Sequence, residues 1–182
     1  AMKLEAFRNI TGTQKKIIPW VGNEYSRVLE NKNRLLESYE GATGGKTGYT
    51  DPAGRCLVTY AEEDDITYIC VVMKCPVTNE AGVKVRYEFS ETKKLYEWVF
   101  NEFEYREVYD TATPVGECPV ELSSDTDSVA LALKNPVNAV VPKEADPSSF
   151  KVDIELFENP AYAPIALGQE LGTATVKYAG ET

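Results

Sequence analysis

The sequence predicts an α+β fold, with an antiparallel sheet and flanking helices followed by a small all-β domain. Two β-rich runs, Arg55–Ala61 and Ile66–Lys74, are joined by four acidic residues and predict a hairpin. Apolar residues at helical spacing follow between positions 90 and 103, which indicates a helix laid on the sheet. Beyond Tyr105 the helical period is lost, prolines recur and short alternating runs take over, which is typical of strands and turns.

The change in pattern places the domain boundary near Glu104–Glu107. The first domain then covers residues 1–106 and the second covers residues 107–182. We expect the second to be a small antiparallel β domain. Its strand-like runs are Val129–Leu133, Ala139–Val141, Lys151–Phe157 and Thr173–Tyr178.

The N-terminal residues predict three short elements. Met2–Ile10 has apolar residues at helical spacing and Gly12 follows as a stop signal, so we expect the end of a helix there. Gln14–Val21 carries several apolar residues and is expected to be extended. Ser26–Tyr39 has a mixed pattern, in which Asn31–Leu36 is compatible with a short helix.

The central helix is expected to begin at Ser90, because a serine suits the N-cap and Glu91 would lie in the first turn. Its apolar stripe is expected to pack on the sheet and consists of Leu95, Trp98, Val99 and Phe103. The strand Ile66–Met73 is apolar on both alternating sets, as in strands that are covered on both faces. Since one helix covers one face only, we expect the other face to be open to water.

Composition excludes several functions. The 182 residues include 29 acidic and 19 basic side chains, giving a formal charge of −10, and no histidine. An acidic chain without a basic stripe is not expected to bind nucleic acid. Without histidine, the chain offers neither Ser-His-Asp nor Cys-His chemistry, and a zinc site is not expected. We expect no metal and no cofactor.

The cysteines carry no redox or metal motif, because no Cys-x-x-Cys spacing occurs. Cys70 and Cys75 are interpreted as small apolar residues of a strand. No apolar run is long enough for a membrane span, and the first residues do not read as a signal peptide.

The segment Gly41–Gly54 is the strongest functional signal. It holds five glycines around one cation, Lys46, and such small residues let a backbone approach a ligand closely. Lysine is a compact charge that suits a carboxylate or a phosphate, and Thr47 adds a hydroxyl. A Walker phosphate loop would need a glycine in place of Glu40, and Tyr49–Pro52 would break its helix. An ordinary glycine-rich turn remains an alternative for the Lys-Thr-Gly triplet alone.

A longer string of residues surrounds this triplet: Asn33-Arg34-Leu35-Leu36, Tyr39, Gly41-Ala42, Gly44, Lys46-Thr47-Gly48-Tyr49-Thr50 and Ala53-Gly54. Together they resemble the serine D-alanyl-D-alanine carboxypeptidases, the low-molecular-weight penicillin-binding proteins of peptidase family S11, in which Lys-Thr-Gly is an established motif. The resemblance continues through the hairpin and the helix. Near the C-terminus, Pro164-Ile165 and Gly168–Gly172 resemble the β domain that follows the catalytic domain of this family. The resemblance implies that the chain consists of the C-terminal part of a penicillin-binding/β-lactamase-like domain, followed by that β domain.

The resemblance implies roles for four residues. The family acylates a serine in a Ser-x-x-Lys motif, a Ser-x-Asn motif follows, and Lys-Thr-Gly lies on the strand that closes the cleft. Lys46, Thr47 and Gly48 would therefore bind the terminal carboxylate of a substrate or of a β-lactam. The backbone N–H of Tyr49 would supply half of the oxyanion hole, so Lys46 and Tyr49 are the expected catalytic positions.

The family's nucleophile motif is not found before Lys46. Ser-x-x-Lys occurs only at Ser90–Lys93 and Ser148–Lys151, and Ser-x-Asn does not occur. We interpret Ser90 as a helix cap and Ser148 as part of a turn. The chain is therefore expected to be the C-terminal portion of such an enzyme, without the half that carries the nucleophile and its base.

By resemblance, the parent function is hydrolysis of the terminal D-Ala–D-Ala bond of peptidoglycan stem peptides in the cell envelope, outside the cytoplasm. Expected ligands are stem peptides and β-lactams, and the chain alone is expected to be inactive. An alternative is a non-catalytic wall-binding or interaction module, whereas the β domain argues against a β-lactamase. Because one sheet face is expected to be open, self-association through the first domain is a further expectation.

Overall fold

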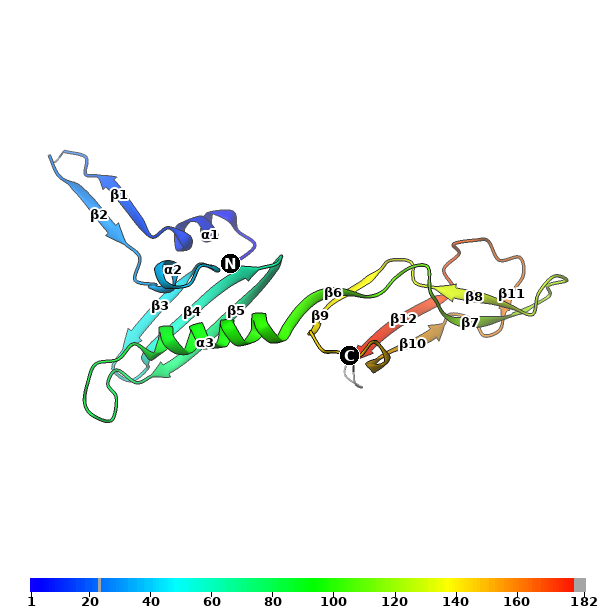
Figure 1. Cartoon of the computed structure of the whole chain (residues 1–182). Helices are drawn as coiled ribbons and strands as arrows, with labels where there is room; N and C mark the ends of the chain where they lie inside the picture. The colour runs from blue at the N-terminus through cyan, green and yellow to red at the C-terminus, as the bar shows by residue number, and fades with distance from the viewer. Residues whose placement is uncertain (23, 179–182) are drawn as a thin grey trace. The chain divides into compact units, whose positions relative to one another are not determined.

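The computed structural model describes residues 1–22 and 24–178, and the chain divides into two compact units, Ala1–Glu102 and Phe103–Thr182 (Figure 1). The predicted α+β class is confirmed, with helices confined to the first unit apart from one short 3-10 turn. The division falls at the end of helix α3 (Tyr87–Glu102), where strand β6 (Phe103–Tyr109) begins. The boundary proposed from the sequence lies a few residues later, inside β6, because Phe103 was assigned to the helix.

Unit 1 is built on a three-stranded antiparallel sheet in the order β3-β4-β5. The strands are β3 (Ala42–Thr50), β4 (Gly54–Glu63) and β5 (Ile66–Cys75). Strands β4 and β5 form the predicted hairpin, and its turn residues Asp64 and Asp65 both have positive φ. The glycine-rich segment therefore forms an edge strand of the sheet, next to this hairpin.

Four short elements precede the sheet: α1 (Glu5–Gly12), β1 (Lys15–Pro19), β2 (Ser26–Glu30) and α2 (Leu35–Ser38). Strands β1 and β2 pair antiparallel, and every residue in them is exposed. The sequence interpretation missed β2 and placed α2 too early. The helix starts late because the Asn33 side chain accepts a hydrogen bond from the Leu35 N–H at 3.2 Å and so turns the chain just before α2.

Helix α3 differs from the prediction in its start and in its buried face. It begins at Tyr87, and Ser90 lies inside it, so Ser90 is not the N-cap. Of the predicted stripe, Leu95 is 44% exposed and Trp98 is 55% exposed. The buried positions are instead Glu88, Phe89, Thr92, Tyr96 and Phe100. Val99 of the predicted stripe does pack against the core, but the buried face includes a glutamate and a threonine, so apolar periodicity alone did not identify it.

One hydrophobic core joins α3 to one face of the sheet. Its buried members are Leu35, Leu57, Ala61, Ile66, Phe89, Tyr96 and Phe100. The rings of Tyr39 and Tyr96 stack at 5.5 Å, and Tyr68 meets Phe100 edge-on at 5.0 Å. Burial raises the pKa of the Tyr96 phenol above its ordinary value.

The opposite face of the sheet is covered only in part: Tyr60 is buried there with its hydroxyl 2.7 Å from that of Thr11 on α1, whereas the rest of the face is open, as expected from the double apolar pattern of Ile66–Met73. Exposed apolar side chains on it are Val58, Ile69, Val71 and Met73, from 45% exposed for Val58 to 74% for Met73. Cross-strand pairs place Val58 beside Val71 on this face. Unit 1 therefore presents an open apolar surface made by β4 and β5, which we call the open sheet face.

Unit 2 consists of short strands, as predicted: β6, β7 (Pro114–Glu121), β8 (Ser128–Ala132), β9 (Val137–Pro142), β10 (Phe150–Leu156), β11 (Ala161–Tyr162) and β12 (Gly172–Tyr178), with the 3-10 turn η1 (Pro147–Ser149). The pairs β6-β9, β10-β12 and β7-β8 are antiparallel, as expected, whereas β11 pairs with β7 in parallel. A small core gathers Val141, Ala145 and Phe150. Strands β6, β7 and β11 had no counterpart among the predicted runs. In the part of the chain that the structure describes, no helix has the length and apolar character needed to cross a membrane.

Candidate carboxylate-binding site

Lys46, Thr47 and Gly48 lie in the middle of edge strand β3. Their cross-strand partners on β4 are Val58, Leu57 and Cys56, respectively. Because directly paired side chains share a face, Lys46 lies on the open sheet face with Val58. Thr47 shares the side of the buried Leu57. The motif therefore presents its ammonium and its hydroxyl on opposite faces of one strand edge.

A buried polar network fixes β3 immediately before Lys46. The Thr59 hydroxyl donates to the Gly44 carbonyl at 2.6 Å, and the Asn33 amide donates to the same carbonyl and to Thr59 Oγ1 at 3.3 Å each. Asn33 and Thr59 are almost completely buried. Such hydrogen bonds are costly to lose in a dry interior, so they hold β3 in register with β4.

The glycines of this segment do not all serve a ligand. A Cβ on Gly44 would lie 2.0 Å from the Tyr60 hydroxyl, and one on Gly45 would lie 2.3 Å from the Val58 carbonyl oxygen. Gly45 also has φ of +134°, which favours glycine. At Gly48 the nearest atom is the Cys56 Cβ at 3.8 Å. The interpretation that the glycines admit a ligand is thus corrected for Gly44 and Gly45, whose close neighbours belong to the protein itself.

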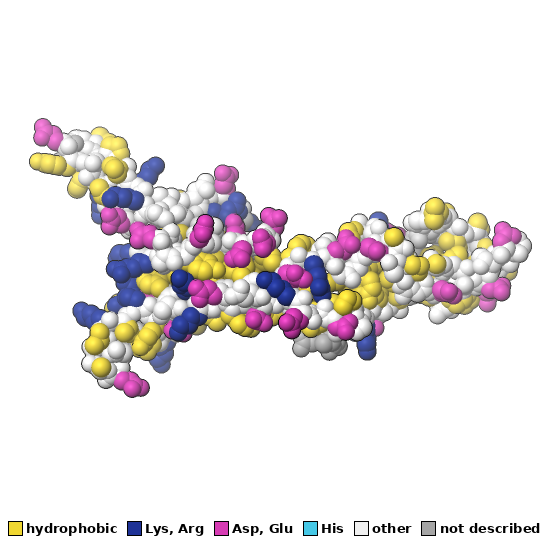
Figure 2. Space-filling model, viewed as in Figure 1, with side chains coloured by type: hydrophobic (Ala, Val, Ile, Leu, Met, Phe, Trp, Pro, Cys, Tyr) yellow, Lys and Arg dark blue, Asp and Glu magenta, His cyan; other side chains and the backbone are white. Residues whose placement is uncertain are grey.

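An open, cationic depression lies beside the motif. It has a volume of about 1060 Å³, and its lining includes Lys46, Thr47, Gly48 and Tyr49. Six of its lining residues are cationic and three are acidic: Lys15, Lys32, Arg34, Lys46, Arg55 and Arg86 against Glu30, Glu37 and Glu88. Figure 2 shows Lys and Arg side chains gathered at this end of unit 1, below the β1–β2 hairpin. In a chain with a formal charge of −10, this local excess of positive charge favours an anionic ligand.

The side chains around the motif are held by local contacts. Lys46 Nζ donates to the Thr47 carbonyl oxygen at 2.5 Å and remains exposed. The Tyr49 hydroxyl donates to Asp51 at 2.6 Å, which raises the pKa of that phenol, and the Arg55 guanidinium lies 5.6 Å from the Tyr49 ring centroid. Tyr49 is therefore fixed from two sides, and its backbone position follows the pairing of β3 with β4.

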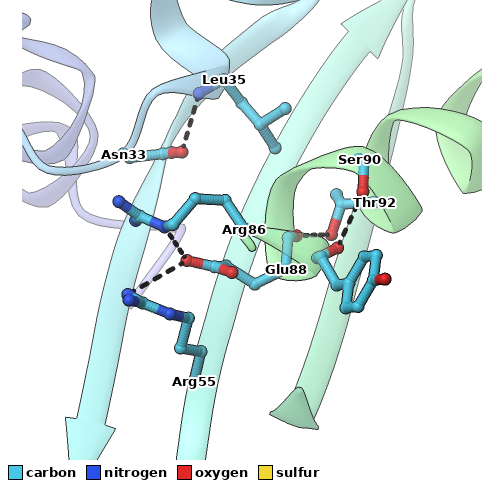
Figure 3. A network of polar contacts seen from close by, with 8 residues as sticks. Asn33, Leu35, Arg55, Arg86, Glu88, Ser90 and Thr92 are labelled. Carbon is cyan, nitrogen blue, oxygen red and sulfur yellow. Dashed lines mark hydrogen bonds and ion pairs between the residues drawn. The ribbon is translucent and has the colours of Figure 1, made fainter. Parts of the chain in front are cut away.

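A second charged group, which the sequence interpretation missed, lines the same depression. Glu88 in the first turn of α3 is 2% exposed, and its Oε1 lies 2.6 Å from Arg86 Nε and 3.7 Å from Arg55 Nη1. Figure 3 shows both guanidinium groups converging on this carboxylate oxygen. The only sequence signal was an arginine and a glutamate two residues apart before an apolar run, which is common at helix starts.

Neither serine of the two Ser-x-x-Lys matches is paired with its lysine. Ser90 is exposed on α3, and Lys93 pairs with Glu97 at 3.7 Å instead. Ser148 lies in the 3-10 turn η1, where its N–H donates to Asp146 at 2.8 Å. Ser148 therefore lies in a turn, as the sequence suggested, whereas Ser90 lies inside α3 and is not its cap.

Comparison with known proteins agrees with this architecture. Residues 1–77 match the family described as D-alanyl-D-alanine carboxypeptidase, and residues 103–182 match the penicillin-binding protein 5 C-terminal domain. The chain is 29% identical over 180 residues to D-alanyl-D-alanine carboxypeptidase DacF of Bacillus subtilis, covering 99% of this chain and 44% of that protein. It is 29% identical over 174 residues to DacA of Escherichia coli strain K12, covering 89% of this chain and 41% of that protein.

Solved structures give the same result. Penicillin-binding protein 5 from Haemophilus influenzae superposes with a TM-score of 0.60 at 27% identity, over 99% of this chain and 48% of that one. The D-alanyl-D-alanine carboxypeptidase DacD from Francisella tularensis gives a TM-score of 0.54 at 28% identity, over 85% of this chain and 36% of that one. The two family matches, one in each unit, and the similarity to penicillin-binding protein 5 assign the chain to the class of penicillin-binding proteins. Within that class the chain is a partial member of the D-alanyl-D-alanine carboxypeptidases, and it spans less than half the length of these relatives.

Proposed function

We propose that the Lys46 edge of β3 binds the terminal carboxylate of a peptide ending in D-Ala-D-Ala, or the carboxylate of a β-lactam. The observation that carries this proposal is the position of Lys46 and Thr47, which lie next to each other on an edge strand and line a cationic depression. Lysine binds a carboxylate as a compact point charge, and the threonine hydroxyl adds a donor.

The strand edge itself supports peptide binding. In the described part of unit 1, β3 has a strand partner on one side only, β4. An extended peptide can pair with the backbone groups of such an edge, which orients it along the strand. The N–H of Tyr49, at the end of the Lys-Thr-Gly triplet, is the proposed donor to the oxygen of the scissile carbonyl.

Hydrolysis through an acyl-serine would require a serine and a base that this site does not contain. No Ser-x-x-Lys precedes Lys46 in the sequence, and the two later matches have structural positions. We therefore propose that these residues contribute the carboxylate-binding side of a serine D-Ala-D-Ala carboxypeptidase site, and that the chain alone does not catalyse the reaction.

The setting of this function is also a proposal. Stem peptides and β-lactams are the partners that the family relationship supports, and the cell envelope is the place where such peptides occur. The open sheet face supports a further partner, a second copy of the chain, since exposed contiguous apolar surface favours association.

The proposal is tested by comparing a peptide with its methyl ester. The isotope-labelled chain is titrated with an N-acetylated peptide ending in D-Ala-D-Ala, and backbone amide signals of Lys46, Thr47, Gly48 and Tyr49 are followed by NMR. We expect saturable shifts with the free acid and much weaker shifts with the ester, which lacks the carboxylate charge. Equal responses to acid and ester would reject the carboxylate contact.

A further inference from the structure

The cluster of Arg55, Glu88 and Arg86 lies in the same depression as Lys46 but is not used by the proposed carboxylate contact. Its anchor is Glu88, which is almost fully buried and pairs with Arg86 Nε at 2.6 Å. A buried carboxylate persists only when cations and hydrogen bonds compensate its lost hydration. Glu88 therefore holds both arginines at the start of α3.

The guanidinium group of Arg86 is held at its Nε edge and at one face of its plane, and its other N–H donors are not used by these contacts. Its Nε donates to Glu88, and its guanidinium carbon lies 4.6 Å from the centroid of the Phe89 ring. Within residues 1–22 and 24–178, its two terminal nitrogens have no hydrogen-bond partner. Because guanidinium presents its donors in a rigid fork, these nitrogens form a ready binding edge for a planar anion.

Two buried polar atoms in the cluster also lack a partner among the described residues, Arg55 Nε and Glu88 Oε2. One is a donor and the other an acceptor, on residues whose closest approach is 3.7 Å. A small movement of Arg55 toward Glu88 would pair them and leave the other edge of Arg55 for a ligand. The cluster is thus incompletely satisfied, as expected of a site that closes around a bound group.

The local charge selects an anion. Two arginines and one glutamate give the cluster a net positive charge. Helix α3, sixteen residues long, begins at Tyr87, between Arg86 and Glu88 in the sequence. The N-terminus of a helix adds partial positive charge. Both features act in a depression that is already cationic.

We infer that Arg55 and Arg86, positioned by Glu88, form a second anion subsite that binds a side-chain carboxylate of the peptide held at Lys46 and Thr47. The preferred ligands are then D-Ala-D-Ala peptides that carry an additional carboxylate. The identity of this ligand rests on the proposed function, whereas the anion subsite itself rests only on the cluster.

The subsite is tested directly with inorganic phosphate as the probe. In the full chain labelled with nitrogen-15, the Nε–H signals of Arg55 and Arg86 should shift saturably with phosphate, in the wild type and in Lys46→Gln alike. Arg86→Gln should abolish the shift of Arg55, whereas Arg27→Gln, which removes one charge outside the depression, should leave both shifts unchanged. If Arg86→Gln unfolds because Glu88 loses a partner, Arg86→Gln/Glu88→Gln replaces it. Unsaturable shifts, or shifts of Arg55 that persist in both Arg86 variants, would overturn the inference.

A pair of peptides then tests the ligand. N-acetyl-L-Glu-D-Ala-D-Ala and N-acetyl-L-Gln-D-Ala-D-Ala differ by one carboxylate, and we expect about fivefold tighter binding of the first, as for one partly exposed charged hydrogen bond. Arg86→Gln should reduce this ratio to one. Lys46→Gln should weaken both peptides and preserve the ratio.

The outcomes separate the two proposals. Binding of neither peptide, with the phosphate response intact, would reject the proposed function and support the subsite. Equal binding of both peptides to the wild type would overturn the subsite as a carboxylate selector while supporting the proposed function.

Discussion

Lys46 on β3 lies directly opposite Val58 on β4, on the sheet face that α3 does not cover. The side chain of Lys46 and the open sheet face therefore share one side of the sheet. Thr47, by contrast, pairs with Leu57, which α3 buries. The position of the cation and the exposure of the apolar surface are consequences of the same strand register.

The charge of Lys46 is expected to account for peptide affinity. Lys46→Ala should weaken binding of an N-acetylated D-Ala-D-Ala peptide by about tenfold, since one charged hydrogen bond is lost, while the free energy of unfolding changes by less than ~0.5 kcal/mol. Lys46→Arg keeps the charge with a different geometry and should be intermediate. Calorimetric titration and urea unfolding of the three proteins check this. Unchanged affinity in Lys46→Ala would show that the cation is not part of the site.

Asn33 is expected to stabilise unit 1 through the network that holds Gly44. Asn33→Ala should lower the free energy of unfolding by about 2–3 kcal/mol, because two buried acceptors lose a donor. Asn9, which is exposed on α1, provides the control: Asn9→Ala should change the free energy of unfolding by less than ~0.5 kcal/mol. The measurement is urea unfolding followed by a signal from unit 1, such as tryptophan fluorescence. Similar values for the two variants would mean that the network contributes nothing to stability.

Two glycines of β3 are expected to behave differently. Gly45→Ala should destabilise unit 1 by more than about 2 kcal/mol, because a Cβ meets the Val58 carbonyl and the residue has positive φ. Gly48→Ala should fold like the wild type, since its Cβ has ordinary contact distances. Thermal unfolding of both variants distinguishes them. Equal stability would contradict the packing role given to Gly45.

Self-association is expected through the open sheet face. Sedimentation of the full chain should show a concentration-dependent dimer or higher species, and Val71→Lys should shift the distribution toward monomer by placing a charge on this face. Leu167→Lys, at a fully exposed position of unit 2, is the matched control and should not change the distribution between monomer and larger species. A wild-type chain that is monomeric at every concentration tested would refute this expectation.

Local pattern and resemblance in the sequence were enough to predict the hairpin β4–β5, the double apolar pattern of β5 and the strand position of Lys46. They could not predict the face of α3, because its buried side includes Glu88 and Thr92, and Glu88 is buried only through its pairing with two arginines. They also missed β2, whose residues are all exposed and therefore lack the alternation that marks a half-buried strand. The Arg55–Glu88–Arg86 cluster could not be predicted from the sequence, because Arg55 and Glu88 lie far apart in the chain and come into contact only in the folded structure.

The central claim is that this chain binds the carboxylate of a penicillin-type ligand without supplying the nucleophile that would be acylated. Mass spectrometry of the full chain with a β-lactam, recorded under both native and denaturing conditions, tests it most directly. We expect a complex under native conditions that Lys46→Ala weakens, and free protein of unchanged mass after denaturation. A stoichiometric adduct that survives denaturation, on Ser90, Ser148 or any other residue, would contradict the account.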